Sequence, residues 1–344
     1  MSARSKVNLA AALAGMLLTC NPCAFALNPA LDVSQYAHTS WKVRDGFTKG
    51  QITSVAQTPD GYLWLGTEFG LLRFDGVRNV AWRPPPGQEL PSNYIVKLLA
   101  ARDGTLWIGT IKGLANWKDG KLTQYPDFVG QIIGSLLEDR DRSIWVSAMQ
   151  GPIGRLCVFR NSGVRCYGKE DGIGYAVWGL YEDTAGNVWS GGDAGIWHWK
   201  PGAPKLYSLP HQPNGIQALA ERDDGGLLVS MVGGIRRFVD GKTQIAYPFP
   251  APLEKFEAHR LLRDHDGGYG SERPAEASCM YTRERRTCLP TRTDSPVTIL
   301  PGFLRIANTI SGLRRPAVST VSGALPSPRF PLSRVCRTPR SRLC

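Results

Sequence analysis

The sequence predicts an all-β fold made of repeated four-stranded units, and three observations support this prediction. A motif of the pattern Asp-Gly-x-Leu-Trp-x-Gly-Thr recurs along the chain, and its copies are nearly evenly spaced. The segments between the copies are short apolar runs separated by Gly, Asp and Asn. Short β-type runs with tight turns, repeated at a fixed interval, are typical of the blades of a β-propeller.

The two clearest copies of the motif occupy residues 60–67 and 103–110, and weaker copies follow at 141–147, 185–190 and 224–230. Successive Trp-equivalent positions are 43, 38, 44 and 39 residues apart, with Leu228 at the last of them. In each unit the apolar run before Asp-Gly is expected to be strand A, and the Trp-containing run strand B. We expect about five blades and part of a sixth within residues 51–268, in an incomplete or open ring.

The repeated tryptophans are expected to be structural. A large apolar side chain at the same place in every unit suits a wedge between consecutive blades better than a stacking platform for a ligand. Gly66 and Gly109 fit this interpretation, because they would allow a neighbouring backbone to approach closely. The residues concerned are Trp64, Trp107, Trp145 and Trp189.

The N-terminus has the pattern of a secretory signal peptide over residues 1–26. Arg4 and Lys6 precede an apolar stretch at 7–18, and Ala24-Phe25-Ala26 supplies a small-x-small cleavage pattern. The apolar stretch is shorter than the roughly 20 residues needed to span a bilayer. We expect export to the periplasm, a lead-in strand within 27–50 and no membrane segment beyond the signal peptide. A lipoprotein site at Cys20 is the alternative, which Thr19 fits poorly.

The net charge of +12 does not indicate a nucleic-acid partner, because it is concentrated at one end of the chain. Residues 268–344 contain 13 Arg, no Lys and four acidic residues, whereas residues 27–267 are nearly neutral. A groove for phosphates would need basic residues in the propeller itself. We therefore expect no nucleic-acid partner.

The repeat pattern stops at Gly268, and residues 269–344 are rich in Arg, Pro and Ser. Reading the codons one base out of frame can restore repeat-like residues at three places, near Tyr269, near Gly312 and near Ser319. We therefore expect a frameshift near codon 268, real or from sequencing, and a disordered tail at 269–344. A genuine Arg-rich disordered tail is the alternative.

The cysteines predict one disulfide and no metal site. Cys157 and Cys166 flank a turn at Asn161-Ser162-Gly163, so a tight hairpin would place them opposite each other. In the oxidising periplasm they are expected to be joined, with two free thiols as the alternative. The spacing of the four tail cysteines matches no zinc pattern. No metal or other cofactor is expected.

A ligand is expected at one end of the propeller. Strands alternate in direction, so the B-to-C and D-to-A loops share one end, and these loops differ from blade to blade. Variable polar and aromatic side chains around one mouth suit a ligand site. The candidate ligand-binding residues are Glu68, Phe69, Asn93, Tyr94, Lys112, Gln150, Tyr175 and Asp193.

No catalytic residues are predicted. The chain has five histidines and shows no His-x-x-x-His or Gly-x-Ser-x-Gly motif. His198 lies between two tryptophans on an expected strand C and is interpreted as a surface or interblade residue. A propeller-type enzyme, a lyase or hydrolase, and a protein-binding scaffold are the alternatives to a sensor.

Residues 57–67 and 70–76, with Trp41 and Asp45-Gly46-Phe47, resemble the regulator-propeller repeat of periplasmic sensor regions. These regions belong to hybrid two-component histidine kinases or diguanylate cyclases, and the resemblance covers about residues 34–267. It implies a ligand-sensing propeller in a two-component system, here a fragment without the kinase or other output domain. It further implies a small ligand, with an oligosaccharide as the family-level candidate, and a homodimer as one assembly of a full-length receptor.

Overall fold

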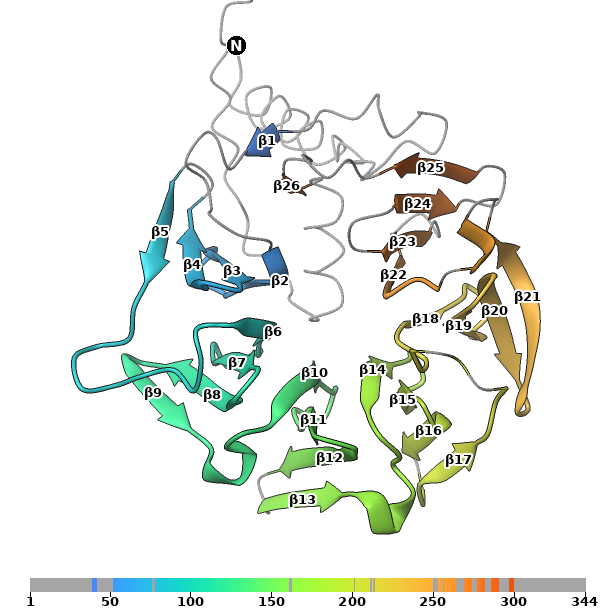
Figure 1. The fold of residues 1–344 in the computed structure, drawn as a ribbon, viewed down its shortest axis with the longest axis horizontal. Coiled ribbons are helices and arrows are strands. Elements are labelled where there is room, and N and C mark those ends of the chain that lie inside the picture. Colours follow the sequence, from blue (N-terminus) through green and yellow to red (C-terminus); the bar gives the residue numbers. More distant parts are fainter. Residues whose placement is uncertain are drawn as a thin grey trace, which may run out of the picture. The chain divides into compact units, whose positions relative to one another are not determined.

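Six four-stranded antiparallel sheets follow one another along the described part of the chain in the computed structural model (Figure 1). The structure describes residues 39–41, 52–75, 78–160, 163–200, 202–210, 212, 214–249, 253–255, 257–263, 269–273, 277–281, 286–290 and 297–299. All of them lie in the first of two compact units, Met1–Leu313, and none lies in the second, Arg314–Cys344. The signal peptide predicted at 1–26 is outside the described residues.

The first three sheets, called blades 1 to 3, each consist of four consecutive strands. Blade 1 contains β2 (Ile52–Gln57), β3 (Leu63–Thr67), β4 (Gly70–Phe74) and β5 (Asn79–Trp82). Blade 2 contains β6 (Ile95–Ala100), β7 (Leu106–Thr110), β8 (Gly113–Lys118) and β9 (Lys121–Gln124). Blade 3 contains β10 (Ile132–Glu138), β11 (Ile144–Gln150), β12 (Ile153–Arg160) and β13 (Gly163–Tyr167).

Blades 4 to 6 repeat this order. Blade 4 contains β14 (Val177–Glu182), β15 (Val188–Gly192), β16 (Gly195–Lys200) and β17 (Lys205–Tyr207). Blade 5 contains β18 (Leu219–Glu221), β19 (Leu227–Met231), β20 (Gly234–Val239) and β21 (Lys242–Pro248). Blade 6 contains β22 (Arg260–Arg263), β23 (Tyr269–Arg273), β24 (Ala277–Tyr281) and β25 (Arg286–Pro290). Among the described residues three short 3-10 helices lie in connections: η3 (Pro126–Phe128), η4 (Lys169–Asp171) and η5 (Leu253–Lys255).

The predicted β-propeller of four-stranded blades is confirmed. In blades 1 to 4 the repeated Trp is the second residue of strand B, and it pairs with the penultimate residue of strand A, as Trp107 does with Leu99. Each blade therefore places its Trp at the same height on the same sheet face. The strand registers follow from this repeated pattern of apolar residues and turns.

Five of the six apolar clusters among the described residues lie between neighbouring blades, and the sixth consists of residues of blade 1. Trp107 of blade 2 shares a buried cluster with Ile133 and Val146 of blade 3, and Trp145 of blade 3 shares one with Val177 of blade 4. A Cβ at Gly109 would lie 2.6 Å from Ile133 Cγ2, so a larger residue there would push blades 2 and 3 apart. Each blade thus depends on its neighbour for a core, as expected for a repeat protein.

Beyond Gly268 the described residues form strands where the sequence predicted a disordered tail. Blade 6 is a full four-stranded sheet in which β23, β24 and β25 extend β22, so the backbone is ordered beyond Gly268 in these segments. The strand β1 (Thr39–Trp41), within the predicted lead-in segment, pairs with β26 (Val297–Ile299). In both places pairing satisfies backbone groups that would otherwise be exposed at a strand edge. The rest of the predicted tail lies outside the described residues.

Candidate functional site

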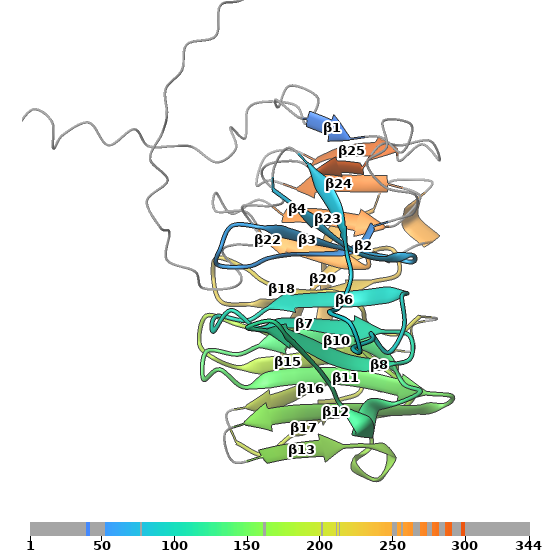
Figure 2. The same ribbon diagram turned by 90° about the vertical axis from the view of Figure 1, so that its left-hand side faces the viewer.

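The propeller has two distinct ends, because adjacent strands in every blade run in opposite directions (Figure 2). The loop face carries the connections from strand B to C and from strand D to the next strand A, such as residues 68–69, 83–94, 125–131 and 168–176. The turn face carries the A-to-B turns at residues 58–62, 101–105, 139–143, 183–187 and 222–226. All the predicted ligand-binding residues lie on the loop face.

Exposed apolar side chains gather on the loop face. Among the described residues ten large hydrophobic side chains are exposed, and six of them lie in loop-face connections or at the adjoining strand ends. Phe69 and Tyr175, both predicted from the sequence, are 66% and 46% exposed. An apolar surface rimmed by polar groups is typical of a binding site. The six residues are Phe69, Tyr94, Val129, Ile132, Ile153 and Tyr175.

Four of the predicted polar residues are available for a ligand. The side chains of these residues make no hydrogen bond or ion pair with any other described residue. They are distributed over blades 1 to 3, so they border the exposed apolar side chains at several points. The four are Glu68, Asn93, Lys112 and Gln150.

Asp193 differs from the other predicted ligand residues, because its carboxylate is already engaged. Its two oxygens accept the backbone N–H groups of Tyr175 and Ala176, each at 2.9 Å. Gly174, with φ +80, brings the loop close enough that a Cβ there would lie 2.9 Å from the same carboxylate. Asp193 therefore fixes the loop that presents Tyr175.

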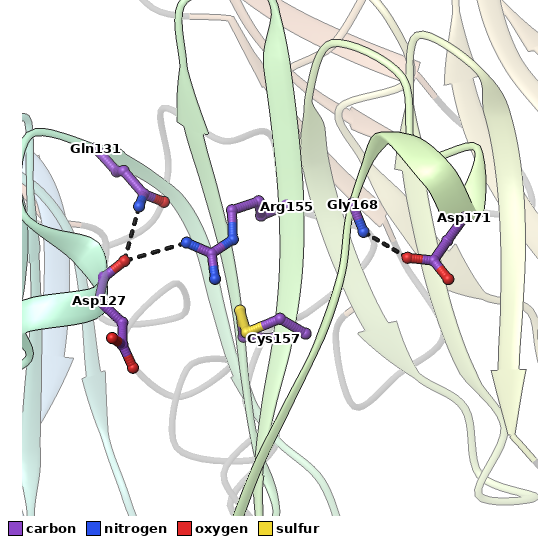
Figure 3. Close-up of a disulfide and its surroundings, with 7 residues drawn as sticks. Asp127, Gln131, Arg155, Cys157, Gly168 and Asp171 are labelled. Carbon is purple, nitrogen blue, oxygen red and sulfur yellow. Dashed lines mark hydrogen bonds between the residues drawn. A yellow bond between two sulfur atoms is a disulfide. The ribbon is translucent and has the colours of Figure 1, made fainter.

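The sequence did not single out a polar cluster on the loop face of blade 3. Gln131 Nε2 and Arg155 Nη1 both donate to the backbone oxygen of Asp127, at 2.8 and 3.1 Å (Figure 3). Gln131 is 6% exposed, and its Oε1 has no partner among the described residues. None of these residues belongs to the repeated motif, so periodicity gave no signal for them.

A disulfide joins Cys157 and Cys166, which lie opposite each other in the register of β12 and β13 (Figure 3). Cys157 is fully buried in the core between blades 2 and 3, whereas Cys166 is exposed on the outer strand. Of the predicted turn, Asn161 and Ser162 lie outside the described residues. The disulfide attaches the outermost strand of blade 3 to its third strand.

The turn face is occupied by hydrogen bonds and ion pairs within the protein. Asp139, with a fully buried side chain, accepts Trp145 Nε1 at 2.8 Å and the backbone N–H of Ser143 at 2.9 Å, and pairs with Lys200 Nζ of blade 4 at 2.9 Å. Burial alone would raise the pKa of Asp139, but the bonds from Trp145 and Lys200 outweigh it and lower the pKa. These groups serve the packing of blades 3 and 4.

The repeated tryptophans have a second structural role that the sequence analysis missed. The indole N–H of Trp145 donates to Asp139, and that of Trp189 donates to Asp183 at 2.9 Å. Trp64 donates in the same way to Thr58 Oγ1, also at 2.9 Å. In each case the acceptor lies six residues before the Trp, so an acid or hydroxyl at that position is the signal that identifies the bond.

His198 is part of a side-chain network within blade 4. Its ring packs against Trp189 with centroids 4.3 Å apart and planes tilted by 30°, and Nε2 lies 3.2 Å from Asn187 Oδ1. Asn187 in turn donates to Asp183. Burial lowers the pKa of His198, and the nearby negative charge of Asp183 raises it by less. These contacts all lie within blade 4, and the network reaches blade 5 only through Trp189, whose ring centroid lies 6.0 Å from that of Phe238.

Neither a metal-ligand cluster nor a membrane-spanning helix is found in the described part of the chain. No group of three or more His, Cys, Asp and Glu residues there could hold a metal ion. No helix there has the length and hydropathy needed to cross a bilayer.

Comparison with sequence families identifies the repeat. The model of the two-component regulator propeller matches residues 46–69 and 89–112. Both matches end in a B-to-C loop of the propeller, at Phe69 and Lys112. A search of curated protein sequences gives no significant match.

Solved structures with similar folds come from proteins of different activities. The extracellular domain of a hybrid two-component system from B. thetaiotaomicron is 15% identical, with a TM-score of 0.59 over 76% of this chain and 38% of that domain. Virginiamycin B lyase from Staphylococcus aureus is 15% identical, with a TM-score of 0.57 over 71% of this chain and 86% of the lyase. The WD40 propeller of Doa1 is 13% identical, with a TM-score of 0.51 over 69% of this chain and 81% of that domain. At these identities the likeness shows a common fold, and this chain spans little more than a third of the bacterial two-component domain.

Proposed function

Because the chain carries two-component regulator propeller repeats, we propose that its propeller is the ligand-sensing part of a two-component signal-transduction system. The sensing site is the loop face, and the ligand is a small molecule, with an oligosaccharide as the first candidate. The propeller works in the periplasm, after export by the signal peptide at residues 1–26. The response is produced by a histidine kinase or cyclase domain, which residues 52–299 do not contain.

The concentration of exposed apolar side chains on one end of the propeller carries this proposal. Aromatic rings such as Phe69, Tyr94 and Tyr175 give a ligand a large contact area with few rotatable bonds. The unengaged side chains of Lys112 and Gln150 nearby supply hydrogen-bond donors and acceptors for orientation. The turn face offers no comparable surface, because its A-to-B turns are tied together by contacts within the protein.

The fixed position of Tyr175 also supports a binding role. The carboxylate of Asp193 bonds to the backbone on which Tyr175 stands, so the ring is exposed while its backbone is held. A binding group that is held in place before the ligand arrives loses less entropy when the complex forms.

A ligand panel with paired variants tests this function. Purified propeller is screened by thermal shift against neutral and acidic oligosaccharides, and hits are measured by calorimetry. Phe69→Ser and Tyr175→Ser are expected to weaken binding about tenfold each, because each removes an aromatic contact worth about 1 kcal/mol or more. Val80→Ser and Ile245→Ser, which change residues of similar exposure on outer strands, serve as controls and are expected to have no effect.

Failure takes two recognisable forms in this test. A ligand whose affinity drops only in the Val80 or Ile245 variants would place the site elsewhere. Turnover of a panel member would indicate an enzyme instead of a sensor.

A further inference from the structure

On the turn face, neighbouring blades are joined by a repeated contact, called the latch. It links the residue two positions after strand A of one blade to the last residue of strand A in the next blade. The backbone N–H of Arg102 in blade 2 donates to Glu138 Oε2 of blade 3 at 2.8 Å. The backbone N–H of Arg140 in blade 3 donates to both oxygens of Glu182 in blade 4, at 3.0 and 2.9 Å. Both arginine side chains also pair with the same carboxylates at 3.3 Å.

The next two seams use the same positions. Thr184 of blade 4 donates its backbone N–H to Glu221 Oε2 of blade 5 at 2.8 Å, and its hydroxyl to Oε1 at 2.5 Å. Between blades 5 and 6 the polarity is reversed, since the guanidinium of Arg263 donates to the carboxylate of Asp223. In all four seams the contact joins the same two positions. One is the last residue of strand A, which is charged. The other is the residue two positions after the end of strand A in the preceding blade.

The seam between blades 1 and 2 lacks both halves of this latch. Ala100 occupies the last position of β6, where it pairs with Leu106 as Glu138 pairs with Ile144. The corresponding donor position in blade 1 is Pro59, which has no backbone N–H. Donor and acceptor are therefore missing together at one of the five seams between blades that are consecutive in the sequence.

Apolar contacts take the place of the latch at the turn-face end of this seam, and two hydrogen bonds between β2 and β6, at 2.7 and 3.0 Å, cross it further towards the loop face. Trp64 of blade 1 packs in a cluster with Ile95 and Leu98 of blade 2, and Trp82 lies edge-on between Trp64 and Trp117. Apolar packing is non-directional, so it tolerates small displacements of one sheet over the other. A charge-assisted hydrogen bond favours one geometry. The two kinds of seam therefore resist movement differently.

From this matched absence we infer that the turn-face end of the seam between blades 1 and 2 is the compliant point of the propeller, where neighbouring blades separate most readily. Domain movements concentrate at a few positions that can absorb them, and regions with fewer fixed contacts open more often. Phe69 and Tyr94 lie on the two sides of the same seam at the loop face.

Hydrogen exchange measured by mass spectrometry on the whole chain tests the inference. Amides of residues 56–63 and 98–106 are expected to exchange about tenfold faster than those of 136–144 and 180–188. Equal exchange at the two seams would overturn the inference.

Glu182→Ala provides the second arm, because it removes the acceptor from a latched seam. We expect exchange in 136–144 and 180–188 to rise to the level of the blade 1–2 seam, while the seam between blades 2 and 3 stays protected. Glu170→Ala, in η4, removes an acid that makes no such contact among the described residues and is the matched control. Unchanged exchange in the Glu182 variant would contradict the latch.

A designed latch completes the test. The double variant Pro59→Ala with Ala100→Glu supplies the missing backbone N–H and the missing carboxylate. We expect it to slow amide exchange at residues 56–63 and 98–106. Neither single variant is expected to slow exchange there. If it folds and slows nothing, the inference fails. If it does not fold because Ala100 is buried, the Glu182 arm decides the question.

Discussion

Arg140 and Glu182 join blades 3 and 4 through three contacts, two from the arginine backbone N–H and one from its side chain. The same guanidinium donates to the backbone oxygens of Asp183 and Thr184, each at 2.9 Å. The pair shows how this fold uses its two ends differently. Polar contacts fix the turn face, which leaves the loop face free to present side chains to solvent.

Removing the buried carboxylate of Asp139 should destabilise the protein strongly. Asp139→Ala leaves the Trp145 indole N–H and the Ser143 backbone N–H without acceptors, which costs about 2–4 kcal/mol of unfolding free energy. Chemical denaturation measures this cost. Asp141→Ala, which removes an exposed partner of Lys200, is the control and should cost less than about 1 kcal/mol. Equal costs would show that burial of Asp139 does not matter.

Gly109 should not tolerate alanine. The added methyl group would lie 2.6 Å from Ile133 Cγ2 and 2.8 Å from its Cβ, so blades 2 and 3 must shift. We expect a loss of about 1–3 kcal/mol, the usual cost of overpacking. Gly168→Ala adds a methyl group to open space and should change stability by less than about 0.5 kcal/mol. Thermal and chemical unfolding of both variants provide the measurement.

Replacing Arg142 with glycine should stabilise the protein. Arg142 has φ +64 in the A-to-B turn of blade 3, where Gly104 in blade 2 has φ +85. A non-glycine residue in this conformation costs about 1 kcal/mol, so Arg142→Gly should raise the unfolding free energy by about that amount. The converse change, Gly104→Ala, should lower it. A loss of stability in Arg142→Gly would mean that the side chain contributes more than the strain.

Stability should fall below neutral pH through His198. Burial holds its folded pKa below the ordinary value of 6.5, so the folded protein binds fewer protons there than the unfolded chain. The contribution is complete above pH 6.5 and is lost as pH falls towards the folded pKa. Melting temperatures measured from pH 7.5 to 5 should decrease, and His198→Gln should reduce the slope. An identical slope in the variant would assign the effect to other groups.

The disulfide should protect both cysteines of blade 3 from alkylation. In unfolded, non-reduced protein, Cys157 and Cys166 should not react with iodoacetamide, and both should react after reduction. Closing so short a loop stabilises the fold by about 2–3 kcal/mol in the chain-entropy model, so reduction should lower the melting temperature. Because the chain has six other cysteines, the alkylated sites are located by peptide mapping, and alkylation of Cys157 and Cys166 before reduction would show that the bond is absent from the purified protein.

The blades could be predicted from the sequence because their signals are local and repeated. The Trp motif, the Asp-Gly turns and the apolar runs fixed strands A and B of blades 1 to 4 and the wedge role of Trp107 and Trp145. The strands of blade 6 beyond Gly268 were not predicted, because Tyr269–Arg273 does not carry the Trp motif. The backbone of this segment pairs with β22 without the motif.

The loop face was harder to predict because its contacts join residues that no sequence rule connects. Phe69 and Tyr175 could be selected as exposed aromatic residues, since they stand in variable loops. Two of its contacts depend on how loops of different length fold over one another. Asp193 accepts a hydrogen bond from the backbone of Tyr175, and Gln131 and Arg155 both donate to the backbone oxygen of Asp127.

A hydrogen-exchange footprint of the bound ligand tests the sensing role of the loop face most directly. The propeller is compared with and without the tightest ligand from the oligosaccharide panel. The account predicts slower exchange in the loop-face segments 91–94, 127–132 and 174–176, with no change in the turn-face segments 101–105 and 183–187. Protection confined to the turn face, or to the outer strands β5, β9 and β13, would contradict it.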